Sequence, residues 1–383
     1  MSLTLPQGFL AAAGTAGLKL SGKPDCALIT ADGPLRWALG TTTNTLKAAC
    51  VTRNRARYES GAPVRAVVIN SGNANCATGA QGARNNERFA AAAAAALGVA
   101  PDEVLTASTG IIGEPLPVEK LARVLPLISA RPAADAAPLA QAILTTDLVS
   151  KTAAVTLASG ARIVGVAKGS GMIHPNMATM FAFVLTDAEL SQEALRRLWH
   201  EVVGKSFNQL TVDGDTSPND MAFLLANPQV PVDVHEFGWG LTEVAQDLAK
   251  QIARDGEGAT KLLSVQVMGA ESDAEARRAA RAVVLSPLVK SAAHGNDPNW
   301  GRILSSVGAA GVRLDLDTLS IRVQGTEVYR GAPGRFDAAA VSRSMNAKDL
   351  EITIDLAAGS GSGVAWGCDL SADYVRINAD YHT

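Results

Sequence analysis

The distribution of apolar residues predicts a chain that mixes strands and helices throughout. Short apolar runs and strict alternation are typical of strands, whereas apolar residues three or four positions apart predict helices with one buried face. The predicted strands are 28–30, 37–40, 64–69, 162–166, 181–185, 263–267, 319–323 and 350–356, and the main predicted helices cover 90–96, 118–125, 139–143, 195–202 and 241–254. A length of 383 residues is ample for two lobes, so the pattern predicts an α/β protein in two lobes.

Small polar residues and glycine mark the predicted turns and helix ends. Thr41 and Thr42 are predicted in a surface turn, and Gly359–Gly363 is predicted as a flexible hairpin turn. Ser272 followed by Glu275 predicts a capping box at the start of a helix.

The strand 64–69 leads into Asn70–Gly79, a loop with three asparagines among small residues. Asparagine tolerates left-handed backbone, so the loop can be purely structural. It can equally line a polar site, because ligands bind at strand ends in α/β proteins. The sequence leaves both interpretations open.

A second candidate site lies at Ser108-Thr109-Gly110, between a strand and the helix 118–125. Backbone N–H groups converge at such a turn and can bind an anion or an oxyanion. Taken alone, the pattern fits a simple Ser/Thr turn better.

Composition and charge exclude several classes of function. The formal net charge of −3 and the aromatic content of 4% give no basis for binding nucleic acid or an acidic membrane. The four cysteines are scattered and indicate reduced thiols. No signal peptide is expected at the N-terminus, so we predict a cytoplasmic protein. The five histidines lack ligand spacing and the 213–220 stretch lacks an EF-hand pattern, so no metal is expected.

The stretch from Ala167 to Met180 joins two predicted strands through a glycine-rich turn. Lys168 opens the turn, and Ala178-Thr179 stands at the start of the second strand. Gly169-Ser170-Gly171 matches neither a G-x-S-x-G nucleophile elbow nor a Walker loop. The layout therefore suggests a threonine nucleophile that faces a glycine-lined, cationic pocket.

These motifs resemble the ornithine acetyltransferase family of arginine biosynthesis. The resemblance runs nearly the whole length of the chain and is most specific in the central stretch. The matching motifs are Ser108–Gly113, Lys168–Met180, Asp213–Ser217, Asp255–Lys261, Asp297–Arg302 and Asn378–Thr383. It implies a two-lobed mixed α/β sandwich of the ornithine acetyltransferase and DmpA-like type, and a self-cleaving enzyme with an N-terminal nucleophile.

The resemblance places the cut between Ala178 and Thr179. Residues 1–178 then form an α chain with the N-terminal lobe and the oxyanion turn, and residues 179–383 form a β chain that begins with the nucleophile. A threonine hydroxyl is a weak nucleophile and needs a base. The α-amino group freed by the cut has an ordinary pKa of about 7.7–8.0, which suits that task.

The resemblance also implies the site residues and the reaction. Thr109 and Gly110 would form the oxyanion hole, and the substrate-binding positions would be Thr145, Lys168, Thr179, Glu257, Asn378 and Thr383. The expected reaction is ping-pong acetyl transfer from N2-acetylornithine to glutamate, without a cofactor, and acetyl-CoA is a further donor in some members. Chains of one precursor would assemble as an αβ heterotetramer.

Two alternatives belong to other classes of protein. An aminopeptidase or amidohydrolase with an N-terminal nucleophile would transfer the acyl group to water. A non-catalytic regulatory protein that binds amino acids would keep its chain intact, but it leaves Ala178-Thr179 and Thr109-Gly110 without a role.

Overall fold

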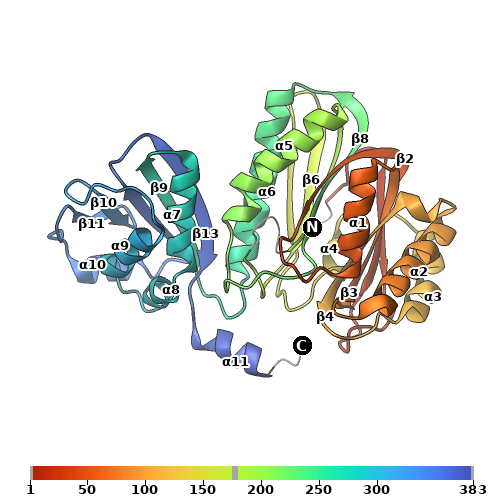
Figure 1. Ribbon diagram of the computed structural model, residues 1–383, viewed down its shortest axis with the longest axis horizontal. Coiled ribbons are helices and arrows are strands. Elements are labelled where there is room, and N and C mark those ends of the chain that lie inside the picture. The colour runs from red at the N-terminus through yellow and green to blue at the C-terminus, as the bar shows by residue number, and fades with distance from the viewer. Residues whose placement is uncertain (1–2, 175–179, 381–383) are drawn as a thin grey trace.

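A computed structural model describes residues 3–174 and 180–380, and within these ranges the paired strands form two sheets (Figure 1). The larger sheet has eight strands in the order β4-β3-β2-β8-β7-β6-β5, with β1 paired to β2. Its strands are β1 (Phe9–Gly14), β2 (Cys26–Thr41), β3 (Val64–Asn73), β4 (Val104–Ile111), β5 (Lys151–Thr156), β6 (Arg162–Lys168), β7 (Phe181–Glu189) and β8 (Met221–Pro231).

The long strand β2 divides the larger sheet into two halves that face each other. Its first part pairs with β1 and β3, and its second part pairs with β8. Alternate residues of both halves meet in one apolar core, where Ile29 and Val67 of the first half join Phe183 and Phe223 of the second. The two half-sheets therefore stack like the layers of a sandwich.

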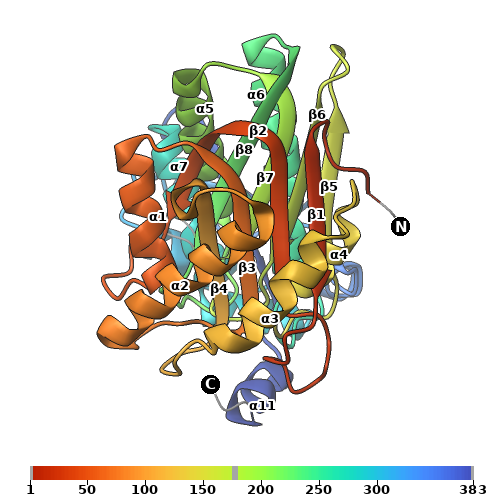
Figure 2. The same cartoon turned by 90° about the vertical axis from the view of Figure 1, so that its right-hand side faces the viewer.

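Helices cover the two outer faces of this sandwich (Figure 2). Apolar side chains of α2 and α3 pack on β3 and β4, and those of α5 and α6 pack on β6, β7 and β8. The helices are α1 (Ala49–Ser60), α2 (Gly79–Leu97), α3 (Val118–Ser129), α4 (Ala137–Ala142), α5 (Gln192–Lys205) and α6 (Val234–Arg254). The expected mixed α/β sandwich is thus confirmed. No described helix is both long and apolar enough to cross a lipid bilayer.

Helix α6 begins at Val234, seven positions before the start that the apolar pattern predicts. The carboxylate of Asp233 accepts hydrogen bonds from the backbone N–H groups of His235 and Glu236, which caps the first turn. The prediction placed the start later because Gly238 and Gly240 interrupt this part of the helix, and glycine is unfavourable inside a helix.

The smaller sheet has five strands in the order β11-β10-β12-β9-β13. It packs against α7, whose first turn is capped by the Ser272 hydroxyl, which accepts from the Glu275 N–H. This is one half of the predicted capping box, since the Glu275 carboxylate accepts from Arg278. Its strands and helices are β9 (Leu262–Ala270), α7 (Asp273–Leu285), α8 (Pro287–His294), α9 (Trp300–Ala309), β10 (Ser320–Val323), β11 (Thr326–Arg330), α10 (Ala338–Ser344), β12 (Asp349–Asp355) and β13 (Gly361–Cys368). The last helix, α11 (Ala372–Asp380), lies below both sheets in Figure 1.

The segment Gly359–Gly363 does not form the predicted hairpin turn. Strand β12 pairs with β9 in parallel, and β13 pairs with the opposite edge of β9 in antiparallel. The glycines instead let β13 approach helix α7. A Cβ on Gly361 would lie 2.2 Å from the carbonyl carbon of Ser272, and one on Gly363 would lie 2.5 Å from the Arg277 nitrogen.

Thr42 is another correction, because its side chain is buried rather than part of a surface turn. Its hydroxyl donates to the Ser217 carbonyl at 2.7 Å, and its N–H donates to the Asp220 carbonyl. Thr42 therefore ties the end of β2 to the segment that leads into β8.

The predicted boundary at position 178 does not coincide with a boundary between the two sheets. Strands β7 and β8 follow that position, yet they belong to the larger sheet together with β1–β6. A chain that ended at Ala178 would therefore share one sheet with the chain that follows it. The boundary at Ala178 stays a prediction, because both Ala178 and Thr179 lie outside the described residues.

The glycine contact between β13 and α7 can be tested by Gly361→Ala. The added methyl group would collide with backbone atoms of Ser272, so we expect a loss of about 1–3 kcal/mol in the free energy of unfolding. Gly308→Ala in α9 is the matched control, because no atom lies within 4 Å of the position that its Cβ would take. This variant should be neutral or stabilise by about 0.5–1 kcal/mol. Equal denaturant midpoints for the two variants would contradict the packing argument.

Candidate active site

A cavity of about 130 Å³ lies where the ends of several strands of the larger sheet meet. This is below the ~300–1,000 Å³ of pockets that hold drug-sized molecules, so it suits a small ligand. The cavity is lined by Ala74, Thr109, Gly110, Ile112, Thr145, Thr146, Lys168, Gly171, Met172, Ile173, Met180, Phe181, Ser217, Asn219, Asp220, Glu257 and Asn378.

Thr109 and Gly110 reach the cavity at the end of β4, which runs parallel to β3. Gly110 has a φ of 133°, and a Cβ there would lie 2.3 Å from the carbonyl carbon of Gly72. Only glycine fits both constraints. The pair is therefore held at the cavity wall by the β3–β4 ladder, and the helix α3 starts only later, at Val118.

Lys168 ends β6 and brings an ammonium group to the same wall. It pairs with Phe181 across the β6–β7 ladder and is only 8% exposed. Its Nζ donates to the Thr109 hydroxyl at 3.4 Å. Burial lowers the pKa of Lys168, while the negative charges of Asp147 and Asp220 oppose that shift.

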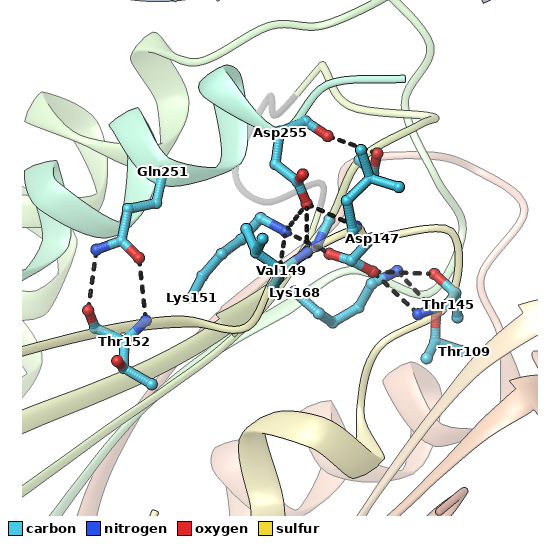
Figure 3. A network of polar contacts seen from close by, with 12 residues as sticks. Thr109, Thr145, Asp147, Val149, Lys151, Thr152, Lys168, Gln251 and Asp255 are labelled. Carbon is cyan, nitrogen blue, oxygen red and sulfur yellow. Dashed lines mark hydrogen bonds and ion pairs between the residues drawn. The ribbon is translucent and has the colours of Figure 1, made fainter. Parts of the chain in front are cut away.

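The carboxylate of Asp147 organises the surroundings of Lys168 (Figure 3). It accepts from the N–H of Thr145 at 2.9 Å, the N–H of Gly169 at 2.6 Å and Nζ of Lys151 at 2.7 Å. Burial alone would raise the pKa of Asp147, but the charges of Lys168 and Lys151 lower it to about 2. Asp147 is thus an anion that links the Thr145 turn to the strand end that carries Lys168.

Lys151 extends the network away from the cavity. Its Nζ also donates to Asp255 at 2.5 Å, and its side chain is fully buried. Asp255 ends helix α6 and accepts from the Leu148 N–H through its carboxylate and from the Ser170 hydroxyl through its backbone carbonyl. The cluster thereby joins α6, β5 and the glycine-rich turn after β6.

Glu257 and Asn378 close the cavity from the C-terminal side. The Asn378 amide donates to the Glu257 carboxylate at 2.9 Å, which brings α11 onto the segment after α6. Gly171 allows Glu257 its position, because a Cβ on Gly171 would lie 2.4 Å from the Glu257 carboxyl carbon.

The turn that follows Lys168 is anchored up to its last described residue. The Asp213 carboxylate accepts from the N–H groups of Met172 and Ile173 at 2.6 and 2.8 Å. The ring of His174 contacts the Thr211 hydroxyl and the Arg281 guanidinium. Burial and the charge of Arg281 lower the pKa of His174 to about 4, so the ring is neutral near pH 7.

The structure brings the described members of the expected site together. All of them line the one cavity: Thr109, Gly110, Thr145, Lys168, Glu257 and Asn378. Ala178, Thr179 and Thr383 lie outside the described residues. Among the described residues, no group of three or more His, Cys, Asp or Glu side chains could hold a metal ion.

Sequence reasoning missed Asp147, Asn219 and Asp220. The spacing of Asp147 and Lys151, which is that of an i,i+4 ion pair, was a visible signal for the first. The 213–220 stretch, considered above only as a possible metal-binding loop, contributes Ser217, Asn219 and Asp220 to the cavity wall.

The asparagine loop 70–79 has a mainly structural role. Asn70 and Asn75 donate to backbone carbonyl groups of Asn73 and Gly82, and Asn73 donates to those of Glu114 and Pro115. Only Ala74 of this loop lines the cavity.

Comparisons with known proteins support a single family. The ArgJ family model matches residues 10–383. The arginine biosynthesis bifunctional protein ArgJ of Thermus thermophilus is 55% identical over 384 residues, covering 100% of both chains. The protein of that name from Deinococcus radiodurans is 54% identical over 382 residues, covering 100% of this chain and 98% of its own. A crystal structure of the Bacillus halodurans ArgJ protein is 40% identical, with a TM-score of 0.52, and covers 53% of this chain and 100% of its own.

The charge of Asp147 should make the stability of the folded chain depend on pH in the acid range. Its pKa of about 2 in the folded chain lies below the roughly 3.9 of an unfolded aspartate. Its contribution is therefore present above about pH 4 and is lost as the pH falls through about 2. In Asp147→Asn, we expect the free energy of unfolding at neutral pH to fall by about 3–5 kcal/mol, because a buried ion pair loses one partner. The free energy of unfolding of this variant should also decline less steeply between pH 4 and pH 2.

Urea unfolding at a series of pH values checks this expectation. Glu119→Gln, which removes an exposed carboxylate from Arg88, is the control and should leave the curve nearly unchanged. The plot of unfolding free energy against pH for Asp147→Asn could instead run parallel to that of the unmodified protein. That result would show that Asp147 is not the titrating group.

Proposed function

The chain belongs to the ArgJ family, and we propose that it transfers an acetyl group from N2-acetylornithine to glutamate through an ester on Thr179. Membership makes it an acyltransferase of arginine biosynthesis. The observation that carries the proposal is the cavity, which gathers Lys168, Thr109, Gly110 and Glu257.

Two features of the cavity support Thr179 as the nucleophile. Described residues on both sides of the 175–179 segment line its wall, Ile173 before it and Met180 after it. Thr109 and Gly110 line the same wall, and the hydroxyl of Thr109 and the N–H of Gly110 would be the donors for an oxyanion.

The first step is a cut in the chain's own backbone. The Thr179 hydroxyl attacks the carbonyl carbon of Ala178, and the peptide nitrogen leaves as the α-amino group of Thr179. Water then hydrolyses the Ala178 ester, which frees the hydroxyl. The new amine, with an ordinary pKa of about 7.7–8.0, takes the role of base.

Acetyl transfer repeats this chemistry on a small substrate. The amine takes the proton of the Thr179 hydroxyl, the oxygen attacks the acetyl carbonyl, and ornithine leaves with the proton. The amine of glutamate then attacks the ester and forms N-acetylglutamate. An oxyanion arises in each step, and one donor of an oxyanion hole contributes about 2.7–4 kcal/mol.

The charges of the cavity suit amino-acid substrates. Lys168 would pair with the α-carboxylate and Glu257 with an ammonium group. Thr145, Asn378 and Thr383 would supply the remaining polar contacts. The same pocket would serve ornithine and glutamate in turn, as a ping-pong reaction requires. Acetyl-CoA as a second donor is part of the proposal, but no step of the transfer depends on it.

The proposed products are an α chain, 1–178, and a β chain, 179–383, that assemble as an αβ heterotetramer in the cytoplasm. One comparison supports the boundary: the Bacillus halodurans chain is matched in full yet covers 53% of this chain. Residues 179–383 are 205 of the 383 residues, which is nearly the same share.

Thr179→Ala removes the nucleophile of both reactions. We expect one uncut chain of full mass without acetyl transfer, because neither ester can form. Intact mass spectrometry and N-terminal sequencing check the cut, and an ornithine-release assay checks the transfer. Thr179→Ser, which keeps a hydroxyl, is the control and should be cut and active. If the alanine variant were cut between Ala178 and residue 179, or transferred acetyl groups, the proposal would be wrong.

Glutamate should be required for turnover. If the acceptor is glutamate, N2-acetylornithine alone should release at most one ornithine per site. The acetyl ester on Thr179 then stays in place, because no acceptor is present to remove the acetyl group. Sustained release without glutamate would identify a hydrolase with an N-terminal nucleophile instead.

A further inference from the structure

A second hollow, of about 1170 Å³, lies between helices α1 and α2, which are neighbours in Figure 2. Small residues make room for it: Ala49 and Ala56 on α1, and Gly79 and Ala83 on α2. We call it the α1–α2 groove. Its volume reaches the upper end of the ~300–1,000 Å³ of pockets that hold drug-sized molecules, so it has room for a ligand much larger than an amino acid.

Basic side chains outnumber acidic ones along the groove. Its described lining holds one carboxylate, that of Glu87, and the five cations Lys47, Arg53, Arg57, Arg84 and Arg88. Burial and the charge of Arg53 lower the pKa of Arg57, so like charges lie close together here. The whole chain carries a formal net charge of −3. The positive charge of the groove is therefore a local feature that favours an anionic ligand.

Two of these cations have no carboxylate partner among the residues that the structure describes. The other three form ion pairs, Arg53 with Glu87, Arg57 with Asp102 and Arg88 with Glu119. Lys47 donates to the Asn44 carbonyl and Arg84 to the Gln81 side-chain oxygen, both at 2.8 Å. Lys47 and Arg84 are therefore free to pair with phosphate groups.

The first turns of α1 and α2 lie close together beside these cations. The amide nitrogen of Asn219 is 3.9 Å from the Cys50 sulfur in α1 and donates to the Ala74 carbonyl ahead of α2. The N-cap residues, Ala48 and Thr78, make no side-chain capping hydrogen bond. Two helix N-termini without side-chain caps add partial positive charge and backbone N–H groups, which suit phosphate oxygens.

The groove also holds an amide without partners. Asn86 of α2 lines it and is 1% exposed. Neither Nδ2 nor Oδ1 of Asn86 has a hydrogen-bond partner within 3–174 and 180–380. Buried polar atoms that stay unpaired are costly and rare. This amide therefore indicates a ligand that offers an acceptor and a donor side by side.

Adenine offers such an edge. Its N7 accepts and its N6 amino group donates, and asparagine pairs with both atoms at once. Asn86 lies seven residues after Gly79, the first residue of α2, which is a rise of about 10 Å along the helix. One phosphate ion does not span that distance, whereas a nucleotide places its base and its phosphates apart.

We propose that the α1–α2 groove binds an adenine nucleotide, with the base at Asn86 and the phosphates at Lys47, Arg84 and the two helix N-termini. The groove adjoins the active-site cavity, because Ala74 lines the cavity and Asn75 lines the groove. Coenzyme A and a free nucleotide such as ADP both carry this chemistry. Only the comparison with coenzyme A rests on the proposed function.

Isothermal titration calorimetry of the unmodified protein with ADP tests the site. We expect saturable binding that weakens as salt is added, because exposed charges are screened. GDP should bind about 5- to 100-fold more weakly, since guanine presents two acceptors, N7 and O6, at the corresponding edge. Inorganic phosphate should bind more weakly still, because it reaches only one end of the groove.

Three variants locate the binding. Asn86→Leu keeps the size of the side chain and removes both unpaired polar atoms, so it should fold and bind ADP about 5- to 100-fold more weakly. Arg84→Gln, at an exposed position, should weaken binding about three- to tenfold. Arg55→Gln is the matched control, because Arg55 belongs to α1 but does not line the groove, and it should bind ADP like the unmodified protein.

Coenzyme A separates the two sources of the ligand. If it displaces ADP and binds more tightly, the groove holds the acetyl-CoA of the proposed function; if ADP binds more tightly, the ligand is a free nucleotide. Either result supports the site.

Three results would overturn the site: no binding of ADP or coenzyme A at millimolar concentration, equal binding of ADP and GDP, or equal ADP binding by Asn86→Leu, Arg84→Gln and Arg55→Gln. Failure of the Thr179 or glutamate tests would leave ADP binding unchanged and would count against the proposed function alone.

Discussion

The fully buried ammonium of Lys151 is the constraint on which the site depends. A buried charge is tolerated only when it is paired and hydrogen-bonded, and this one is held by Asp147 at 2.7 Å and Asp255 at 2.5 Å. Asp147 is thereby fixed against the Gly169 N–H, and Asp255 against the Ser170 hydroxyl. One ion cluster thus fixes the backbone directly after Lys168, whose own ammonium faces the cavity.

This arrangement explains why the site lies at one end of a sheet built from two halves. The β3–β4 ladder presents Thr109 and Gly110, and the β6–β7–β8 ladders present Lys168 and the segment before Met221. Asn219, just before β8, donates hydrogen bonds to the carbonyl groups of Ala74 and Ser108 in the other half. A wall held by rigid strands keeps oxyanion donors and the ammonium in place before a substrate arrives, which is what electrostatic catalysis needs.

The sequence predicted β3, β6, β7 and β9 and the glycine-rich turn with its residues at strand ends, because these depend on local pattern. Lys168 and Thr109 belong to that class. The same pattern missed β1, β5, β8, β11 and β13. Asn219 could not be predicted, since its meaning comes from Ala74 and Ser108, which lie 145 and 111 positions away. The Gly359–Gly363 prediction failed for a similar reason: the glycines serve a contact with α7, not a local turn.

The central claim is that the hydroxyl of Thr179 carries the acetyl group between two amino acids. The most direct measurement is to incubate the purified protein with N2-acetylornithine in the absence of glutamate, digest it and locate the acetyl group by peptide mass spectrometry. The account predicts one acetyl group on Thr179, lost when glutamate is added. Acetylation of Lys168 or Ser217 instead, or none that glutamate removes, would contradict it.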